Sequence, residues 1–277
     1  MVELSQNKSI TFDELEDILY LLKMSSDFDL SDYSKSSLKR RIDRVMALEQ
    51  MDLVDLKNAI VNIDGFTNYM MEEISVNVTE MFRDPSFFRA LQENVIPYLG
   101  TFPQLRLWSA GCATGEELYS LAILLKNENL LDRSFLYGTD ISQKALDVAK
   151  KGVYSIDKIK HYTKNFNTVY PMHSFANHYT AMYDAAIINN EYRSNTLFSL
   201  HNLVSDNVFN EFQLISCRNV LIYFNKSLQD RVLNLFYESL NLFGFLCLGT
   251  KESLYGHVVK DNFKVVDKKY NIFQKIR

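Results

Sequence analysis

From residue 105 onward, short apolar runs alternate with segments of helical periodicity, and this alternation constrains the fold more than any other feature. The apolar runs cover residues 105–109, 135–140, 212–216 and 245–249. Helical segments follow from residue 116, from residue 142 and over about 226–242. Buried strands joined by helical crossovers form a mostly parallel sheet that is covered on both faces. The sequence therefore predicts an α/β fold for this region.

The first 99 residues indicate a different architecture, because they contain only one of the nine glycines, Gly65. Apolar residues recur there at helical spacing over 12–22, 38–46 and 53–63, which predicts amphipathic helices packed as a small bundle. A further helix is expected from Asp84, as the N-cap, and Pro85. We predict three parts, namely a helical N-terminal domain at 1–76, a linker with the first helix of the next domain at 77–104, and an α/β domain at 105–277.

The stretch from residue 152 to 202 fits the strand-helix alternation poorly. It is polar and rich in Asn and Tyr, with strand-like pieces near 179–183 and 195–200. We interpret residues 153–200, approximately, as an insertion that carries a small antiparallel β element.

Composition excludes several classes of function. A net charge of −4 and a pI of about 5.8 argue against nucleic acid as a partner. Cys112, Cys217 and Cys247 are odd in number and widely spaced, so neither a disulfide framework nor a metal site is predicted. The N-terminus carries acids where a signal peptide is apolar, and Asn241 interrupts the longest apolar stretch. We expect a cytoplasmic protein without direct membrane insertion.

The first strand runs into a glycine turn that opens a helix, as in doubly wound folds that bind nucleotides. Gly111 lies in this turn, and Asp140 ends the next strand, where an acid accepts hydrogen bonds from ribose hydroxyls. Glu116 and Glu117 begin the helix and would repel a pyrophosphate. They suit a nucleoside with a cationic ammonium tail, such as S-adenosylmethionine, although acids at a helix N-terminus also simply complement the macrodipole.

Two further constellations are expected near this turn. Residues 77–85 join the two regions, and residues 217–224 follow the buried strand 212–216 at the ligand-binding edge of the sheet. Asn219 offers both a donor and an acceptor. Tyr223 can stack or donate a hydrogen bond, although taken singly it is more typical of an aromatic residue at the core edge.

Five motifs in succession resemble those of the CheR family of bacterial chemotaxis receptor O-methyltransferases. They are N-V-T-x-x-F-R-D-P at 77–85, W-S-A-G-C-A-T-G-E-E-x-Y-S at 108–120, Y-G-T-D-I at 137–141, S-C-R-N-V-L-I-Y-F at 216–224 and G-F-L-x-L-G-x-x-E-S at 244–253. The resemblance runs from about residue 38 to residue 254. It implies a helical N-terminal domain followed by a Rossmann-like methyltransferase domain with a small antiparallel β insertion.

The resemblance also implies the activity. Family members use S-adenosylmethionine to methylate the γ-carboxylate of receptor glutamates, which forms a methyl ester and releases S-adenosylhomocysteine. The expected partner is the cytoplasmic methylation region of a chemotaxis-type receptor. Two alternatives stay open: a signalling module that binds S-adenosylmethionine without turnover, and an O-methyltransferase for a small carboxylate.

Matching motifs assign roles to individual residues. Glu117 would hold the amino group of the cofactor, Asp140 the ribose, and Asn202 with Leu203 the adenine. The remaining implied contacts to cofactor or active site are Asn77, Thr79, Arg83, Gly111, Arg218 and Asn219. Tyr223 would lie near the transferred methyl group. Arg83 would orient the acceptor carboxylate. The alternative role for this residue is an ionic contact that holds the linker to the catalytic domain.

The sequence departs from the family pattern at four places. Gln213, Leu118 and Lys251 replace an Asp, a Pro and a His that are usual there, and the insertion lacks an Arg-rich strand. The last departure puts in doubt whether the insertion docks a receptor-tail peptide.

The helix expected over residues 38–46 carries a local basic face. A 100° step per residue places Arg40 and Arg44 away from the apolar stripe, with Arg41 at its edge. An ordinary solvated surface is the simplest interpretation. The family resemblance favours contact with the acidic methylation region of a receptor.

Overall fold

A computed structural model describes residues 9–26, 29–75 and 77–277, and it divides the chain into two compact units. The first, called the helical unit here, consists of the chain up to Val76 together with Ile222–Leu228. The second, the catalytic unit, consists of Asn77–Leu221 and Gln229–Arg277. A short segment from late in the sequence thus packs with the N-terminal helices.

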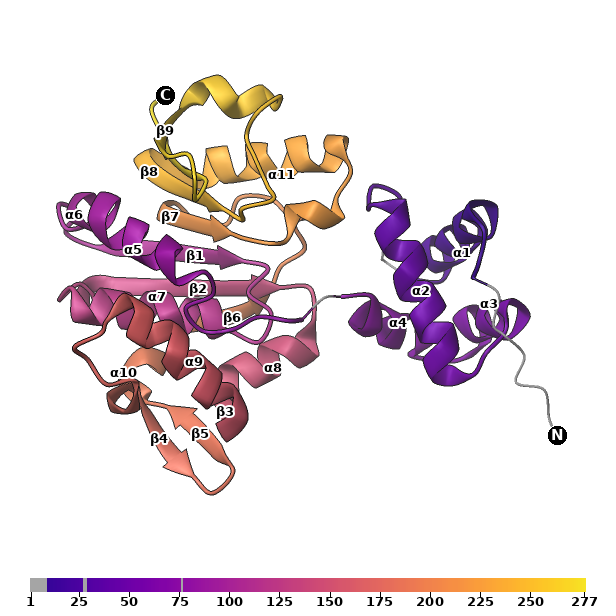
Figure 1. Cartoon of the computed structure of the whole chain (residues 1–277). Coiled ribbons are helices and arrows are strands. Elements are labelled where there is room, and N and C mark those ends of the chain that lie inside the picture. Colours follow the sequence, from indigo (N-terminus) through magenta and orange to yellow (C-terminus); the bar gives the residue numbers. More distant parts are fainter. Residues whose placement is uncertain (1–8, 27–28, 76) are drawn as a thin grey trace. The chain divides into compact units, whose positions relative to one another are not determined.

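The helical unit contains the amphipathic helices that the periodicity predicts (Figure 1). They are α1 (Phe12–Ser25), α2 (Lys35–Glu49) and α3 (Leu53–Asn62). A fourth helix, α4 (Phe66–Ile74), was not predicted. Thr11 and Glu14 form a capping box that fixes the start of α1. Each helix buries one stripe of apolar side chains, which in α2 consists of Leu38, Ile42, Val45 and Met46.

A seven-stranded sheet forms the centre of the catalytic unit. Its strands are β1 (Leu105–Ala110), β2 (Ser134–Asp140), β6 (Thr196–Leu200), β7 (Phe212–Cys217), β8 (Leu240–Leu248), β9 (Phe263–Asp267) and β10 (Ile272–Lys275). The order is β6-β2-β1-β7-β8-β10-β9. The first five strands pair in parallel, and β10 is antiparallel to both β8 and β9. The predicted parallel sheet is confirmed, with an antiparallel hairpin added at one edge.

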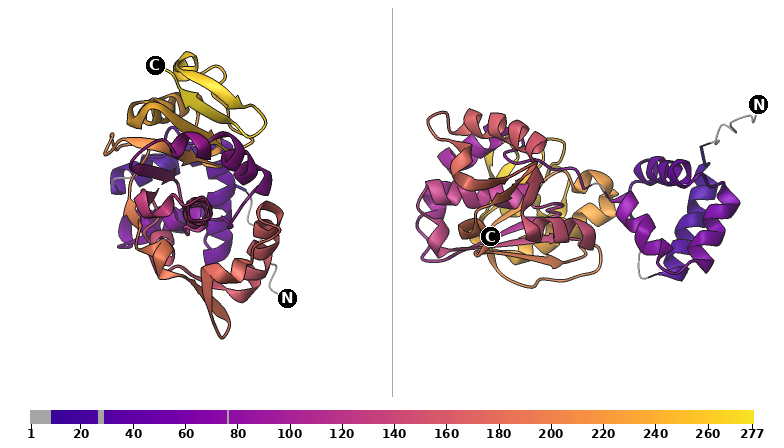
Figure 2. Two further views of the ribbon diagram at one scale, coloured as in Figure 1. Left: turned by 90° about the vertical axis from the view of Figure 1, so that its left-hand side faces the viewer. Right: turned by 90° about the horizontal axis from the view of Figure 1, so that it is seen from below.

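Helical crossovers cover both faces of this sheet. The helices of the catalytic unit are α5 (Pro85–Asn94), α6 (Ile96–Leu99), α7 (Glu116–Asn127), α8 (Gln143–Lys151), α9 (Ile156–Val169), α10 (Asn190–Arg193) and, for most of its length, α11 (Lys226–Ser239). Short 3-10 helices cover Leu131–Arg133, Phe175–His178, Leu221–Tyr223 and Val258–Asn262. The chain passes outward from β1 in one direction and from β7 in the other. Right-handed crossovers therefore place α7 and α8 on one face and α11 on the opposite face (Figure 2).

A second, three-stranded antiparallel sheet lies within the segment expected to be an insertion. It consists of β3 (Val153–Ser155), β5 (Ala185–Ile188) and β4 (Tyr179–Met182), in that order. The prediction that residues 195–200 belong to this antiparallel element is wrong, because β6 pairs in parallel with β2 in the large sheet. The sequence shows a strand there but not its partner.

The core of the catalytic unit is apolar and aromatic. Trp108 on β1 is fully buried and lies against Phe209, Phe212 and Phe236. Within the described residues, no helix combines the length and the apolar character needed to cross a membrane.

Candidate cofactor site

The strand order predicts where the ligand crevice of the catalytic unit lies. The chain leaves β1 toward β2 and β6, and later proceeds from β7 to β8 on the other side. In doubly wound folds, ligands bind at such a reversal, outside the carboxyl ends of the two central strands. Gly111 directly follows β1, and Arg218 with Asn219 directly follows β7. The predicted glycine turn and the predicted Asn therefore meet at the same edge.

The glycine turn needs glycine for two separate reasons. Gly111 has a φ of +71°, and a Cβ atom there would lie 2.5 Å from Cγ2 of Val220. The backbone N–H groups of Gly111 and Cys112 donate to the carbonyl oxygen of Thr139 at 2.8 and 2.9 Å. The turn is thus tied to the end of β2 and packed directly against the segment that follows β7.

Asp140 is buried and holds this turn in place. Its carboxylate accepts hydrogen bonds from the backbone N–H of Ala113 at 2.8 Å and of Ser142 at 3.0 Å. A carboxylate is an acceptor of the kind that the ribose hydroxyls expected here require. The Asn77 amide donates to the Ser142 hydroxyl at 3.3 Å, which brings the linker motif to the same place.

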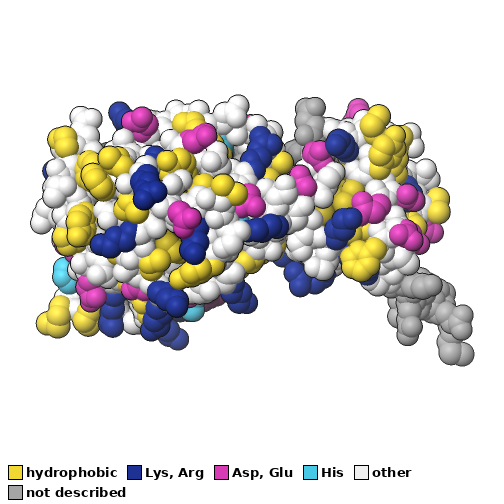
Figure 3. All heavy atoms as spheres, turned by 90° about the horizontal axis from the view of Figure 1, so that it is seen from above, with side chains coloured by type: hydrophobic (Ala, Val, Ile, Leu, Met, Phe, Trp, Pro, Cys, Tyr) yellow, Lys and Arg dark blue, Asp and Glu magenta, His cyan; other side chains and the backbone are white. Residues whose placement is uncertain are grey.

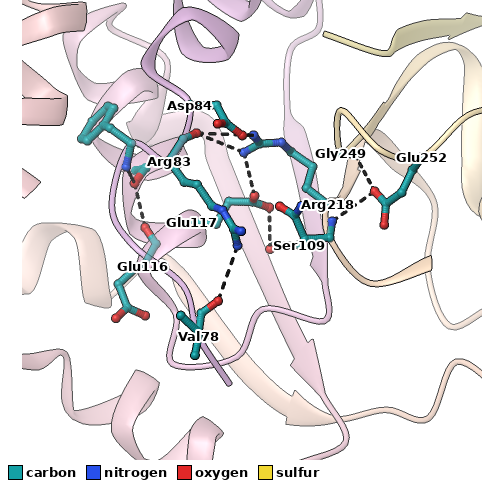
Figure 4. A network of polar contacts seen from close by, with 12 residues as sticks. Val78, Arg83, Asp84, Ser109, Glu116, Glu117, Arg218, Gly249 and Glu252 are labelled. Carbon is teal, nitrogen blue, oxygen red and sulfur yellow. Dashed lines mark hydrogen bonds and ion pairs between the residues drawn. The ribbon is translucent and has the colours of Figure 1, made fainter. Parts of the chain in front are cut away.

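Arg218 is the centre of a charged network at the carboxyl end of β7 (Figure 4). Its side chain is 1% exposed, and its guanidinium contacts Glu117 at 3.2 Å and Asp84 at 2.6 Å. The same group lies 3.9 Å from the centre of the Phe87 ring, and the Ser109 hydroxyl donates to Glu117 at 3.1 Å. Glu117 is therefore a charged acceptor that is already oriented. The expected N-cap residue Asp84 makes no side-chain cap and uses its carboxylate for this network instead.

The two adjacent glutamates have different partners. Glu116 is fully buried, and its carboxylate accepts hydrogen bonds from Thr114, Tyr162 at 2.8 Å and Lys158 at 3.2 Å. Burial, together with this carboxylate, raises the pKa of Tyr162, so the phenol stays protonated as the donor. Glu116 thus ties α7 to α9, whereas Glu117 belongs to the network around Arg218.

The other predicted residues of the catalytic unit lie on the linker before α5 and in the turn after β6. Thr79 and Arg83 are half-buried on the linker, where Arg83 reaches the carbonyl oxygen of Val78 at 3.5 Å. Asn202 and buried Leu203 follow β6, in a turn whose start is tied to β2 by a bond from the His201 N–H to the Asp140 carbonyl.

Tyr223 differs from the other predicted site residues, because it belongs to the segment that packs with the helical unit. The basic residues predicted for partner binding are on α2 of that unit. Arg40 and Arg44 are exposed, and Arg41 is half-buried.

The sequence reasoning gave no role to Glu252, which supports the segment after β7. This buried carboxylate accepts from the backbone N–H of Asn219 at 3.0 Å, of Val220 at 2.8 Å and of Gly249. Burial raises its pKa, and the backbone hydrogen bonds oppose that shift. The Glu-Ser pair of the last motif was the available signal for this residue.

A thiolate mechanism does not fit this crevice. Burial raises the pKa of the Cys112 thiol well above its ordinary value, and the nearby carboxylates of Asp140 and Glu117 raise it further. A neutral, buried thiol is a poor nucleophile.

Residues of the crevice fit S-adenosylmethionine. Nε of Arg218 and Oδ1 of Asn219 are buried and, within the described residues, have no hydrogen-bond partner, so a donor and an acceptor await a ligand. The Glu117 carboxylate has the sign of charge that an ammonium requires, and the Asp140 carboxylate is an acceptor of the kind that ribose hydroxyls require. The doubly wound fold and these groups define a Rossmann-like methyltransferase that uses S-adenosylmethionine.

Comparison with known proteins gives the family. Residues 77–272 match the family model described as CheR methyltransferase, SAM binding domain. The chain therefore belongs to the CheR methyltransferase family. A Pseudomonas putida protein named Cher3 is 43% identical over 265 residues, which are 95% of this chain and 96% of that protein.

Two further relatives are named chemotaxis protein methyltransferase. The Listeria monocytogenes protein is 29% identical, over 90% of this chain and 96% of its own length. The Salmonella typhimurium protein is 26% identical, over 91% of this chain and 88% of its own length. Both alignments are too long to be confined to the catalytic unit.

Proposed function

We propose that this protein transfers a methyl group from S-adenosylmethionine to glutamate γ-carboxylates in the cytoplasmic methylation region of chemotaxis-type receptors. Glutamate methyl esters and S-adenosylhomocysteine are the products. The names of the long relatives support a role in chemotaxis. The observation that carries the choice of a carboxylate acceptor is the state of Arg83. Among the described residues, its guanidinium makes a single long hydrogen bond, at 3.5 Å, to a backbone oxygen.

Charge explains why Arg83, rather than Arg218, would meet the acceptor. Arg218 is committed to Glu117 and Asp84, so its charge is already neutralised. Arg83 is half-buried and contacts no carboxylate that the structure describes. A planar guanidinium in this state is suited to hold a carboxylate in one orientation. Pairing that was too tight would reduce the nucleophilicity of the acceptor, so we assign Arg83 to positioning.

The chemistry requires little beyond such positioning. A glutamate side chain has an ordinary pKa of about 4.3 and is an ionised nucleophile at pH 7, so the enzyme needs no general base. The bound cofactor supplies an activated methyl group on a sulfonium. Holding two reactants in line contributes roughly 7–11 kcal/mol in well-oriented reactions. We therefore assign Glu117, Asp140 and Asn219 to orienting the cofactor.

The test uses methyl-labelled S-adenosylmethionine with the purified protein and receptor-containing membranes from its source. Base-released label in a receptor-sized band is the expected result, because methyl esters are labile to base. Label in a small molecule would instead identify a small-carboxylate methyltransferase. Cofactor binding without any transfer would identify a signalling module. Arg83→Ala should lower receptor methylation, whereas Arg89→Ala, on the adjoining α5, is the matched control and should not.

We assign receptor contact outside the crevice to Arg40, Arg41 and Arg44. Both signs of charge are interspersed on the face shown in Figure 3, so electrostatic recognition of an acidic receptor has to be local. Arg40 and Arg44 are exposed on α2, away from its buried stripe. Such a pair would speed encounter with an acidic helix without contacting the cofactor.

A further inference from the structure

A cavity of about 350 Å³ lies within the catalytic unit, where the end of α8, the short helix α10 and the start of β6 meet. Its lining includes Lys150 from α8, Asn190 and Arg193 from α10, and residues 196–198 from β6. Sites for small molecules have volumes of about 300–1,000 Å³, so this cavity can hold a compact organic molecule.

The cavity is separate from the cofactor crevice. Asp140 and Ser142 of the crevice precede the first residue of α8, whereas the cavity lies at the last turn of that helix. A helix of nine residues extends about 13 Å. None of the residues assigned above to the cofactor or to the receptor lines the cavity.

Both cationic side chains that line the cavity lack an ion pair. Within the part of the chain that the structure describes, neither Lys150 nor Arg193 contacts a carboxylate. Nε of Arg193 is buried and, among the same residues, has no hydrogen-bond partner. A buried donor in this state costs free energy unless water or a bound molecule accepts its hydrogen bond. On a protein with a net charge of −4, two unpaired cations in one cavity indicate a site for an anion.

Negative groups next to the cavity are engaged elsewhere. The Glu191 carboxylate, also on α10, forms an ion pair with Lys126 at 2.9 Å. The carbonyl oxygen of Ala149, at the negative end of α8, accepts a hydrogen bond from the Tyr119 hydroxyl at 2.7 Å. These groups therefore do not neutralise the two cations, whose charge is left for a ligand.

An apolar wall faces the same cavity. Leu197 is exposed on β6, which is an edge strand of the large sheet. Phe198 is buried, and its ring is so close to the glycine turn that a Cβ atom on Gly115 would lie 3.2 Å from its Cζ. The ring also contacts Tyr119, with centres 5.7 Å apart. This packing holds the wall in place before a ligand binds, and an apolar group of the ligand would pack against it.

We propose that this cavity binds a small phosphate monoester with an apolar or aromatic body. A phosphate dianion matches two cations, and its oxygens accept hydrogen bonds from the Arg193 guanidinium and the Lys150 ammonium. A carboxylate would neutralise only one of them. The inference is independent of the proposed function, because no residue of this cavity takes part in methyl transfer.

Phenyl phosphate is the probe, with benzoate and phenol for comparison. Phenyl phosphate should bind the purified protein with a Kd of about 1 mM or tighter, as expected for a molecule of this size. Benzoate should bind about fivefold more weakly, because it carries one negative charge instead of two, and phenol should not bind measurably. In NMR spectra, the arginine Nε–H signal that is missing from Arg193→Lys should shift on titration of the wild-type protein.

Two variants and a matched control test the cations. Arg193→Gln should weaken binding about tenfold or more, because a charge-assisted hydrogen bond to a buried donor is lost. Lys150→Gln should weaken it about two- to fivefold, since this side chain is exposed. Lys151→Gln removes the next charge on α8, which is also exposed but does not line the cavity, and should leave the Kd unchanged. Because positions 150 and 151 are exposed, this comparison remains decisive if Arg193→Gln does not fold.

Saturating S-adenosylmethionine should not displace phenyl phosphate. Displacement would show that the probe occupies the cofactor crevice and would overturn the proposal. Equal weakening by Lys150→Gln and Lys151→Gln would show diffuse attraction to a basic surface, which also overturns it. Binding without a shift of the Arg193 Nε–H signal, or no binding at all, has the same consequence.

Discussion

Replacing Arg218 by Met should destabilise the catalytic unit strongly, because the Glu117 carboxylate is then buried without a cation. Glu117 has a side chain only 13% exposed and would lose its cation. Removing one partner of a buried pair costs about 3–5 kcal/mol. Asp84 is 44% exposed, so water screens its charge and its loss adds only about 0–1 kcal/mol. The contact with Phe87 at 3.9 Å is also lost, although the Met side chain restores part of that packing.

Trp108 provides the assay, since it is the only tryptophan of the chain and is fully buried in β1. Its fluorescence reports the unfolding of the catalytic unit alone. A loss of about 3–5 kcal/mol should lower the urea midpoint by roughly 1–2.5 M, at a slope of about 2–3 kcal/mol/M. Adding Glu117→Gln to Arg218→Met should recover part of this loss, because the double variant has no buried carboxylate charge at position 117. A midpoint shift below about 0.3 M, or no recovery in the double variant, would refute the reasoning.

Three further outcomes are expected. Asp140→Ala and Glu117→Ala should each weaken S-adenosylmethionine binding about 10- to 150-fold, because a charge-assisted hydrogen bond contributes about 1.5–3 kcal/mol. Calorimetry measures this affinity, and unchanged affinity in both variants would show that the pocket lies elsewhere. Arg40→Glu with Arg44→Glu should reduce receptor methylation most at low salt without changing cofactor affinity, and normal methylation would return both residues to the solvated surface. Burial lowers the pKa of His178 to about 4, so between about pH 6.5 and 4 the unfolded chain binds a proton that the folded chain does not, and stability should fall as the pH falls through that range. If the urea midpoints of wild type and His178→Phe change equally with pH, this reasoning is wrong.

Local patterns predicted the parts of the site that depend on nearby residues. A glycine after a buried strand and an acid at the end of the next one identified Gly111 and Asp140, since parallel strands bring their carboxyl ends together. Partners distant in the sequence were not predictable. Lys158 neutralises Glu116 from 42 residues away, and Arg218 reaches Asp84 across 134 residues. Periodicity reports burial at one residue, whereas ion pairs depend on how whole helices pack.

The pairing of β6 shows the same limit. Residues 196–200 have the composition of a strand, but the choice between a parallel and an antiparallel partner depends on the path of the preceding 40 residues. That path includes a complete small sheet, which no residue near β6 indicates.

Because the helical unit includes residues 222–228, its sequence is not continuous, and this affects how the protein folds during synthesis. Roughly 150 residues separate the end of α4 from this segment. At roughly 5–20 residues per second, a ribosome completes α4 about 7–30 s before residues 222–228 are made. During that interval Asp32 cannot yet contact Asn225, nor Tyr33 the Phe224 ring, although the helices around them have been made. The last contacts of the helical unit can therefore form only after β1 to β7 have been made, although the catalytic unit still awaits β8, β9 and β10 at that point.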